Sequence, residues 1–152
     1  MGRINLKRMI LGGLLAGVVI NLVEFIAHGM ILKHAWAISM AALGLTPGIS
    51  TTSRVVFIAW GFLVGLVAVW LYAGLRPRYG AGPKTALRAG LTFWVLAYLT
   101  PAFGQAALKL FPSSLMLAAS GVGLVAAVLA TLAGAWLYRE ANEAPSDLAL
   151  RL

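Results

Sequence analysis

The chain has 152 residues, of which 61% are hydrophobic and only 11% are charged, and its formal net charge is +8. Soluble domains carry about 25% charged residues, so this composition excludes a soluble globular protein and indicates a membrane protein. The chain contains no cysteine, which excludes disulfides, thiolate metal sites and a cysteine nucleophile.

Four apolar runs divide the chain, and each is long enough to cross a hydrocarbon core about 30 Å thick. We expect transmembrane helices at about 9–32, 55–75, 89–108 and 115–138. Strands are not expected, because isolated strands leave backbone groups unpaired in lipid and these runs lack the alternation of barrel strands. The prediction is a single all-α domain over residues 1–152, a polytopic four-helix bundle with a frayed tail at 139–152.

The connections between the runs differ in length. The first is the only long one, and its apolar middle, 35–43, precedes the glycine and proline turn signals of 44–48. We predict a short helix there, lying at the membrane interface in the first outer loop. The other connections are expected to be tight turns. Pro83 is placed to begin the third helix, and Ser113 or Ser114 to cap the fourth.

Basic residues are unevenly divided between the two sides of the runs. One side holds Arg3, Lys7, Arg8, Arg76, Arg78, Lys84, Arg88, Arg139 and Arg151, and the other holds Lys33, Arg54 and Lys109. By the positive-inside rule, both termini and the second connection are cytoplasmic, and the other two connections face outward.

This basic surface is expected to contact lipid rather than nucleic acid. Its predicted partners are the anionic headgroups of the cytoplasmic face, met by Arg76, Arg78, Lys84 and Arg88 of the second connection. Nucleic acid is not expected as a partner, because the basic residues flank membrane spans and form no separate domain.

The first run carries a polar stripe. At about 100° per residue, Gly13, Gly17, Asn21, Glu24 and His28 share one helical face. Glu24 is the only acidic residue inside a predicted span, and an ionised carboxylate there is costly unless it is paired, hydrated or protonated. His28, four residues later, can pair with it. The stripe predicts either a buried polar clasp that orients helices or a functional polar track.

The third run contains a proline near its middle. Pro101 cannot donate to the Ala97 carbonyl, so we expect a kink and a freed carbonyl that could meet a ligand or Asn21. Tyr98 and Gln105 flank the kink and complete the candidate polar site with the three polar residues of the first run. Glu24 is expected to face this helix near Tyr98 or Pro101. Ordinary kinking with local repacking is the alternative.

Small residues predict close helix packing. Two runs have G-x-x-x-G spacing, and small residues repeat along the fourth run. The predicted packing positions are Gly13, Gly17, Gly61, Gly65, Gly123 and Gly134. One of these seams could instead contact a second copy of the chain or another membrane protein.

No catalytic residue, metal site or cofactor is predicted. Glu24 and His28 could supply two metal ligands, but the only other histidine, His34, lies beyond the first run. The three other carboxylates all lie in 139–152, so no Ser-His-Asp arrangement can be assembled.

Several segments resemble a group of small hypothetical bacterial inner-membrane proteins. They are Asn-x-x-Glu at 21–24, Trp-Gly-Phe-Leu-Val-Gly at 60–65, Trp-Leu-Tyr at 70–72 and the segment 76–85. The resemblance implies four spans and a multi-pass location in the bacterial inner membrane, and it implies no activity. We therefore expect a non-enzymatic membrane subunit that acts through packing, lipid contact or partner binding. The alternative is a small proton-coupled transporter or permeation protein that uses Glu24.

Overall fold

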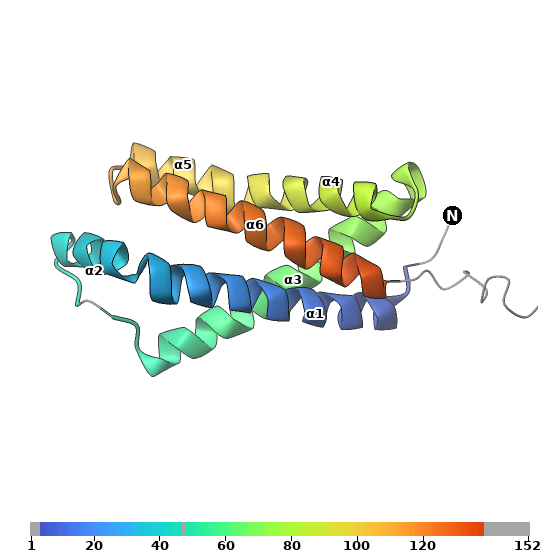
Figure 1. Ribbon diagram of the computed structural model, residues 1–152, viewed down its shortest axis with the longest axis horizontal. Helices are drawn as coiled ribbons and strands as arrows, with labels where there is room; N and C mark the ends of the chain where they lie inside the picture. Colours follow the sequence, from blue (N-terminus) through green and yellow to red (C-terminus); the bar gives the residue numbers. More distant parts are fainter. Residues whose placement is uncertain (1–3, 47, 139–152) are drawn as a thin grey trace, which may run out of the picture.

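The computed structural model describes residues 4–46 and 48–138, which form a bundle of helices (Figure 1). Within these residues there is no strand, and two short π-helical turns, η1 and η2, interrupt the α-helices. The elements are α1 (Leu6–Ile26), η1 (Ala27–Ile31), α2 (Lys33–Ala42), α3 (Thr51–Tyr79), α4 (Pro83–Trp94), η2 (Val95–Leu99), α5 (Thr100–Ala107) and α6 (Ser113–Leu137). The predicted frayed tail, 139–152, lies outside the described residues, as do Arg3 and Pro47.

Four helical stretches are long and apolar enough to span a membrane. They are Leu6–Ile31, Thr51–Tyr79, Pro83–Ala107 and Ser113–Leu137. The predicted all-α architecture with four apolar helices is therefore confirmed, and it indicates a multi-pass membrane protein. The third stretch combines α4, η2 and α5, because the chain continues through Pro101 in helical conformation.

The connection between α3 and α4 is shorter than the gap between the predicted helices at 55–75 and 89–108. Helix α3 continues through Pro77, which lies in its last turn, where the missing N–H removes only one helical hydrogen bond. The Gly80 N–H still donates to the Arg76 carbonyl at 2.8 Å. The helix ends at Gly80, whose φ of 79° lies in the left-handed region that favours glycine. Pro83 begins α4, as predicted.

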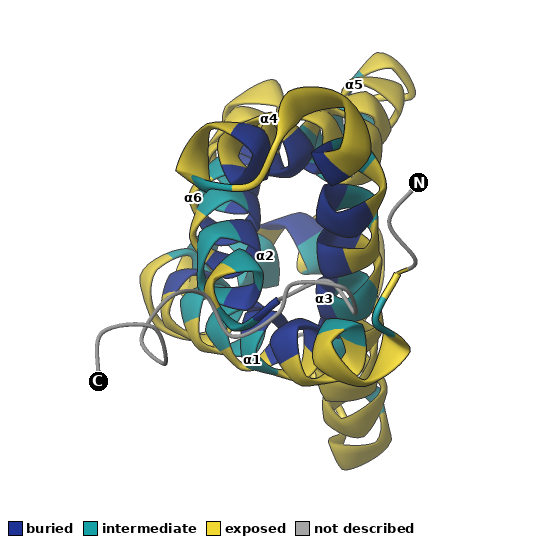
Figure 2. Ribbon diagram, turned by 90° about the vertical axis from the view of Figure 1, so that its right-hand side faces the viewer, coloured by how far each residue is buried: buried dark blue, intermediate teal, exposed yellow. Residues whose placement is uncertain are grey.

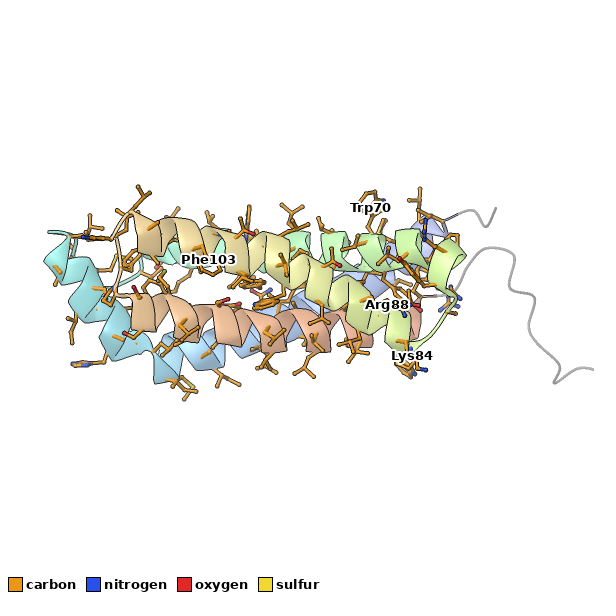
Figure 3. All side chains as sticks on the ribbon, turned by 90° about the horizontal axis from the view of Figure 1, so that it is seen from above. Trp70, Lys84, Arg88 and Phe103 are labelled. Atoms are coloured by element: carbon orange, nitrogen blue, oxygen red, sulfur yellow. The ribbon has the colours of Figure 1, made fainter. Side chains whose placement is uncertain are left out.

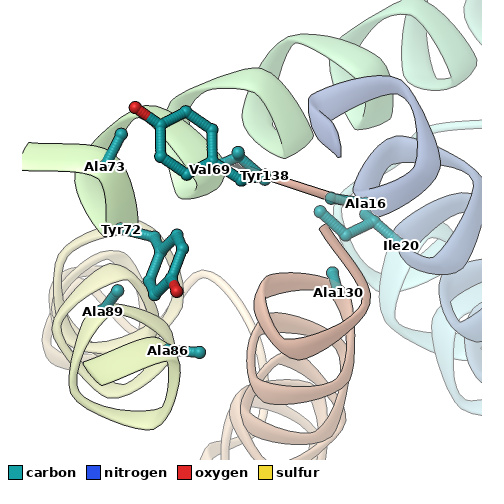
Figure 4. Close-up of a cluster of buried hydrophobic side chains, with 9 residues drawn as sticks. All are labelled: Ala16, Ile20, Val69, Tyr72, Ala73, Ala86, Ala89, Ala130 and Tyr138. Carbon is teal, nitrogen blue, oxygen red and sulfur yellow. The ribbon is translucent and has the colours of Figure 1, made fainter. Parts of the chain in front are cut away.

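Helices α1, α3, α4 and α6 surround a common core (Figure 2). Helix α1 packs against α3 and α6, and α4 packs against the same two helices. Figure 4 shows the central cluster of buried side chains, which comprises Ala16, Ile20, Val69, Tyr72, Ala73, Ala86, Ala89, Ala130 and Tyr138. More than half of these residues are alanine, and small side chains allow helix backbones in a membrane to approach closely.

Helix α1 meets α3 through the two predicted glycine seams. A Cβ atom on Gly17 would lie 2.8 Å from the Phe62 Cα, and a Cβ on Gly65 would lie 2.6 Å from the Gly13 carbonyl oxygen. Side chains do not tolerate such distances, so the contact requires glycine. Gly61, the remaining seam residue, is buried on the same face of α3.

Helix α6 approaches α1 through a second glycine contact. A Cβ atom on Gly134 would lie 2.8 Å from the Gly12 carbonyl oxygen, and one on Gly12 would lie 2.6 Å from the Gly134 carbonyl oxygen. Gly134 is a predicted packing position, whereas Gly12 lies beside the predicted seam. Helix α1 therefore uses glycines to contact both of its large neighbours.

The outward faces of the bundle are apolar. The first turns of α3 are exposed at Val56, Phe57 and Trp60, and Figure 2 shows exposed residues along the outside of every long helix. Helices that are apolar all round are typical of membrane spans. Trp70, Lys84 and Arg88 lie toward one end of the bundle and Phe103 toward the other (Figure 3).

We call the end that contains the α3–α4 turn the basic end, and the opposite end the α2 end. Lys84 and Arg78 are exposed at the basic end. The Arg78 and Arg88 guanidinium groups lie 5.9 and 4.6 Å from the centre of the Tyr79 ring, a cation–π arrangement. The basic end thus presents cations and an aromatic ring together.

Arg76 does not face the surface as expected. It is only 6% exposed, and its guanidinium lies 5.3 Å from the centre of the Tyr138 ring and 6.0 Å from that of Tyr72. Arg76 is therefore buried rather than exposed like the other basic residues of this segment, because its position on α3 turns it toward the core. The other three basic residues of this group remain exposed.

The α2 end holds the predicted short helix, α2, and its place at a membrane surface stays a prediction.

The prediction that Ser113 or Ser114 caps the fourth helix is wrong. Helix α6 already begins at Ser113, and the residue at the cap position is Pro112, which provides no side-chain hydrogen bond. Proline has no side-chain acceptor, so the first amides of α6 lack the usual cap.

Candidate functional site

The Glu24 and His28 side chains form the centre of the site. Glu24 Oε2 and His28 Nε2 are 3.0 Å apart, and the two side chains are 29% and 26% exposed. The residues lie four positions apart, which places them one above the other on a helix. The chain changes from α1 to the π-helical turn η1 between them, and such turns are frequent at functional sites.

Trp36 of α2 determines which histidine nitrogen carries the proton. Its Nε1–H donates to His28 Nδ1 at 2.8 Å, and an indole nitrogen can only donate. His28 Nδ1 is therefore the acceptor, which assigns the proton of a neutral imidazole to Nε2. His28 Nε2–H then donates to Glu24 Oε2, so the imidazole links α2 to the carboxylate.

Tyr98 of η2 reaches the same carboxylate from the opposite helix. Its hydroxyl group lies close enough to Glu24 to interact with the carboxylate electrostatically. This contact lies outside standard hydrogen-bond geometry, and the buried Oε1 atom of Glu24 has no partner of standard geometry. Glu24 therefore lies near Tyr98, as expected, but one of the two carboxylate oxygens lacks a hydrogen bond.

A glycine of α6 makes room for the Tyr98 ring. A Cβ atom on Gly123 would overlap the ring, with Tyr98 Cβ only 2.8 Å away. The ring also packs edge-to-face on Phe93, with centroids 6.2 Å apart. Gly123 is a predicted packing position, and its role is to allow Tyr98 to lie close to α6.

A cavity of about 140 Å³ adjoins this network. Ten residues line it: His28, Trp36, Ala97, Tyr98, Pro101, Ala102, Gln105, Met116, Ala119 and Ser120. Ser120 is only 4% exposed, and its Oγ atom has no hydrogen-bond partner. Buried hydroxyl groups usually have partners, so this wall of the cavity offers a free polar group beside His28 and Tyr98.

Asn21 is separate from this network, although it shares a face of α1 with Glu24. Its Nδ2 donates to the Gly17 carbonyl at 2.9 Å and to the Ile58 carbonyl at 3.2 Å. A Cβ atom on Gly61 would lie 2.5 Å from this nitrogen. The predicted polar stripe therefore divides into a clasp between α1 and α3 at Asn21 and a network around Glu24.

The region before Pro101 differs from the predicted simple kink. The preceding residues form the π-helical turn η2, and the Thr100 hydroxyl donates to the Val95 carbonyl at 2.7 Å. Asn21 does not meet the Ala97 carbonyl, because its amide bonds to α1 and α3 instead. The wider π turn is one of the local adjustments by which membrane helices accommodate proline.

Of the predicted site residues, the structure brings together Glu24, His28, Tyr98 and Gln105. Two further residues, Trp36 and Ser120, were not predicted. Trp36 follows Lys33 and His34 just beyond the first apolar run, a position typical of an interface anchor, and Ser120 lies among small packing residues. Within 4–46 and 48–138, no three histidine or carboxylate side chains are grouped so that they could hold a metal ion.

Comparison with protein-family models, with curated proteins and with solved structures finds no match to this chain. Its function is therefore argued from the geometry of the site.

Proposed function

We propose that this protein is a small proton-coupled membrane carrier in which Glu24 takes up and releases the proton. The observation that carries the proposal is the buried Oε1 atom of Glu24, which has no partner of standard geometry. A carboxylate charge that is only partly satisfied is unfavourable inside a membrane span, and protonation of Oε1 removes the charge. One oxygen of the carboxylate is thus left free to bind a proton.

The adjoining cavity supplies space for a solute whose binding could be linked to that proton. A volume of about 140 Å³ corresponds to roughly four or five water molecules at about 30 Å³ each, so the solute would be small. Two residues that line the cavity, His28 and Tyr98, also contact the Glu24 carboxylate. A solute that moves either side chain would change how well the carboxylate is stabilised.

A structural or partner-binding subunit, the first expectation from the sequence, is the alternative. A purely structural clasp requires each buried polar group to be satisfied, as Asn21 is. Two unpartnered atoms, Glu24 Oε1 and Ser120 Oγ, instead favour the carrier. A second copy or another membrane protein as partner remains part of the structural alternative.

The proposed orientation follows from charge. The basic end would face the cytoplasm and contact anionic headgroups through Arg78, Lys84 and Arg88. The α2 end, with its cavity, would face outward. The proposed location is the inner membrane of a bacterium, as the sequence resemblance implies.

Proton movement in reconstituted vesicles tests the proposal. Vesicles with a pH-sensitive dye inside would receive opposing gradients of small amines, amides or amino acids, one at a time. We expect at least one solute to drive proton movement, and Glu24→Gln, which preserves shape and cannot ionise, to reduce the rate by at least about tenfold, as expected for loss of an essential acid–base group.

Glu24→Asp is the matched control, because it keeps an ionisable group, and it should retain part of the rate. Glu24→Gln that folds normally and moves protons as fast as the parent would exclude the carrier. Loss of binding to a copurified protein partner, with no proton movement in the parent for any solute of the panel, would favour the structural alternative.

A further inference from the structure

Helix α2 borders an open space on the side that faces the α5–α6 connection, although its Ser39 is buried. Its packing within the described chain is mainly with η1, the turn that precedes it. A second cavity, of about 620 Å³, separates its Ile38 and Ala42 from Lys109 and Phe111 of the α5–α6 connection. A single residue, Leu32, joins α2 to η1. The helix therefore borders free space on one side and meets the preceding turn at a single residue.

Trp36 is the point at which α2 reaches the bundle. Its indole donates to His28 Nδ1 at 2.8 Å and packs edge-to-face on Phe111, with ring centroids 5.3 Å apart. The same side chain lines the smaller cavity with His28 and Tyr98. Because Trp36 is both an attachment and a wall, detachment of α2 would open this cavity.

The attachment depends on the protonation state of His28. A neutral imidazole accepts at Nδ1 and donates from Nε2, as the two contacts of His28 require. In the imidazolium form both nitrogens donate, so Nδ1–H and the indole N–H would be two donors facing each other. The Trp36 contact is then lost, whereas the contact with Glu24 is strengthened by the new charge.

The charged and titratable groups around His28 favour this sequence of events. Glu24 of α1 faces Nε2 at 3.0 Å and balances a positive imidazolium. Tyr98 of η2 lines the same cavity. Lys33 and His34 at the start of α2 are exposed. No described residue from α5 or α6 that lines this cavity is charged.

We propose that α2 is a lid that narrows the entrance to the 140 Å³ cavity, held in place by the hydrogen bond from Trp36 to neutral His28 and released when His28 gains a second proton. This inference rests on the proposed function, because it describes how acid would regulate access to the same site. Imidazole is the side chain that changes charge between about pH 5 and 8, so the lid would open as the solution at the α2 end becomes acidic.

Cysteine labelling tests the lid, since the natural chain contains no cysteine. Ala119→Cys reports on the cavity, which Ala119 lines, and Ser114→Cys provides an exposed control on the same helix. A small charged methanethiosulfonate reagent is applied, and the Ala119→Cys rate is divided by the Ser114→Cys rate. From about pH 8 to about pH 5.5 this ratio should rise about tenfold, the ratio expected for loss of one ordinary hydrogen bond.

Two added substitutions should abolish the pH dependence in opposite ways. Trp36→Phe keeps the aromatic contact with Phe111 and removes the donor, so the ratio should be high at both pH values. His28→Gln keeps a neutral acceptor at every pH, so the ratio should be low at both.

A pH-independent ratio in the parent would overturn the lid, as would a pH dependence that survives in both variants. These outcomes are separate from the test of the proposed function, because labelling does not require transport. Proton movement that is unchanged in Glu24→Gln, with pH-dependent labelling intact, would instead reject the carrier and leave the lid.

Discussion

The Glu24 carboxylate takes its properties from neighbours on other elements, and the position of Tyr98 among them depends on Gly123. The Tyr98 ring occupies the space that a Gly123 side chain would need. Gly121, two residues earlier on the same helix, has no atom within 4 Å of the position of a Cβ. Gly121 is therefore a matched control for Gly123, because only Gly123 makes room for the Tyr98 ring.

We predict that Gly123→Ala displaces Tyr98 from Glu24 and lowers proton movement in vesicles several-fold, whereas Gly121→Ala leaves the rate unchanged. The loss should resemble that of Tyr98→Phe, which removes the hydroxyl alone. Circular dichroism would establish that each variant is folded. Equal rates for the two alanine variants would show that the position of Tyr98 does not matter to the activity.

At the scale of single residues, the sequence predicts side-chain contacts within one helix, but it does not predict contacts with side chains from other helices. The spacing of Glu24 and His28 already indicates their contact. The donation from Trp36 to His28 depends on how the chain folds back after η1, and the position of Ser120 depends on the rotation of α6. Neither follows from spacing along the sequence.

Helices α1 and α3 are joined by the glycine seams and by the Asn21 amide. A Cβ atom on Gly61 would collide with that amide, whereas one on Gly74, also in α3, would meet no atom within 4 Å. We predict that Gly61→Ala destabilises the bundle by about 1–3 kcal/mol, as overpacking at a close contact does. Gly74→Ala should be neutral or stabilising by up to about 1 kcal/mol, because alanine favours helix.

Thermal unfolding in detergent, followed by circular dichroism, measures this difference. The melting temperature should fall for Gly61→Ala and should not fall for Gly74→Ala. A similar response of both variants would mean that the Asn21 clasp does not contribute to stability.

Elements differ in how far the sequence determines them. The four long apolar runs predict helices because lipid leaves the backbone no other partners. The π turns are not predictable in the same way. At Pro101 the sequence predicts only that one helical hydrogen bond is missing, whereas the structure has a π-helical turn at 95–99 before the proline.

At the scale of the whole molecule, the basic residues divide the bundle into two unlike ends. Their distribution predicts that the basic end is cytoplasmic. An impermeant thiol reagent added to intact cells should label Thr52→Cys, near the α2 end, and should label Ala81→Cys, in the α3–α4 turn, only after the cells are opened. Labelling of Ala81→Cys in intact cells would reverse the orientation.

The sequence also could not predict which helices are neighbours. Each glycine seam indicates a close contact but does not name the partner. Which helices become neighbours depends on which surfaces fit together. The glycine seam of α1 packs against the seam of α3, and Gly12 of α1 packs against Gly134 of α6. The cavity beside Glu24 exists because these contacts place η2, α5 and α6 opposite η1 and α2.

Infrared difference spectroscopy of the protein in lipid, recorded between acidic and alkaline pH, tests the central claim most directly. We predict a carboxylic acid C=O band that appears on acidification, shifts in D₂O and is absent in Glu24→Gln. The four acidic side chains are Glu24 and three in the tail, so a variant with the tail side chains changed to amides should retain the band. A band that is identical in Glu24→Gln and in the parent would contradict the claim that Glu24 takes up and releases a proton.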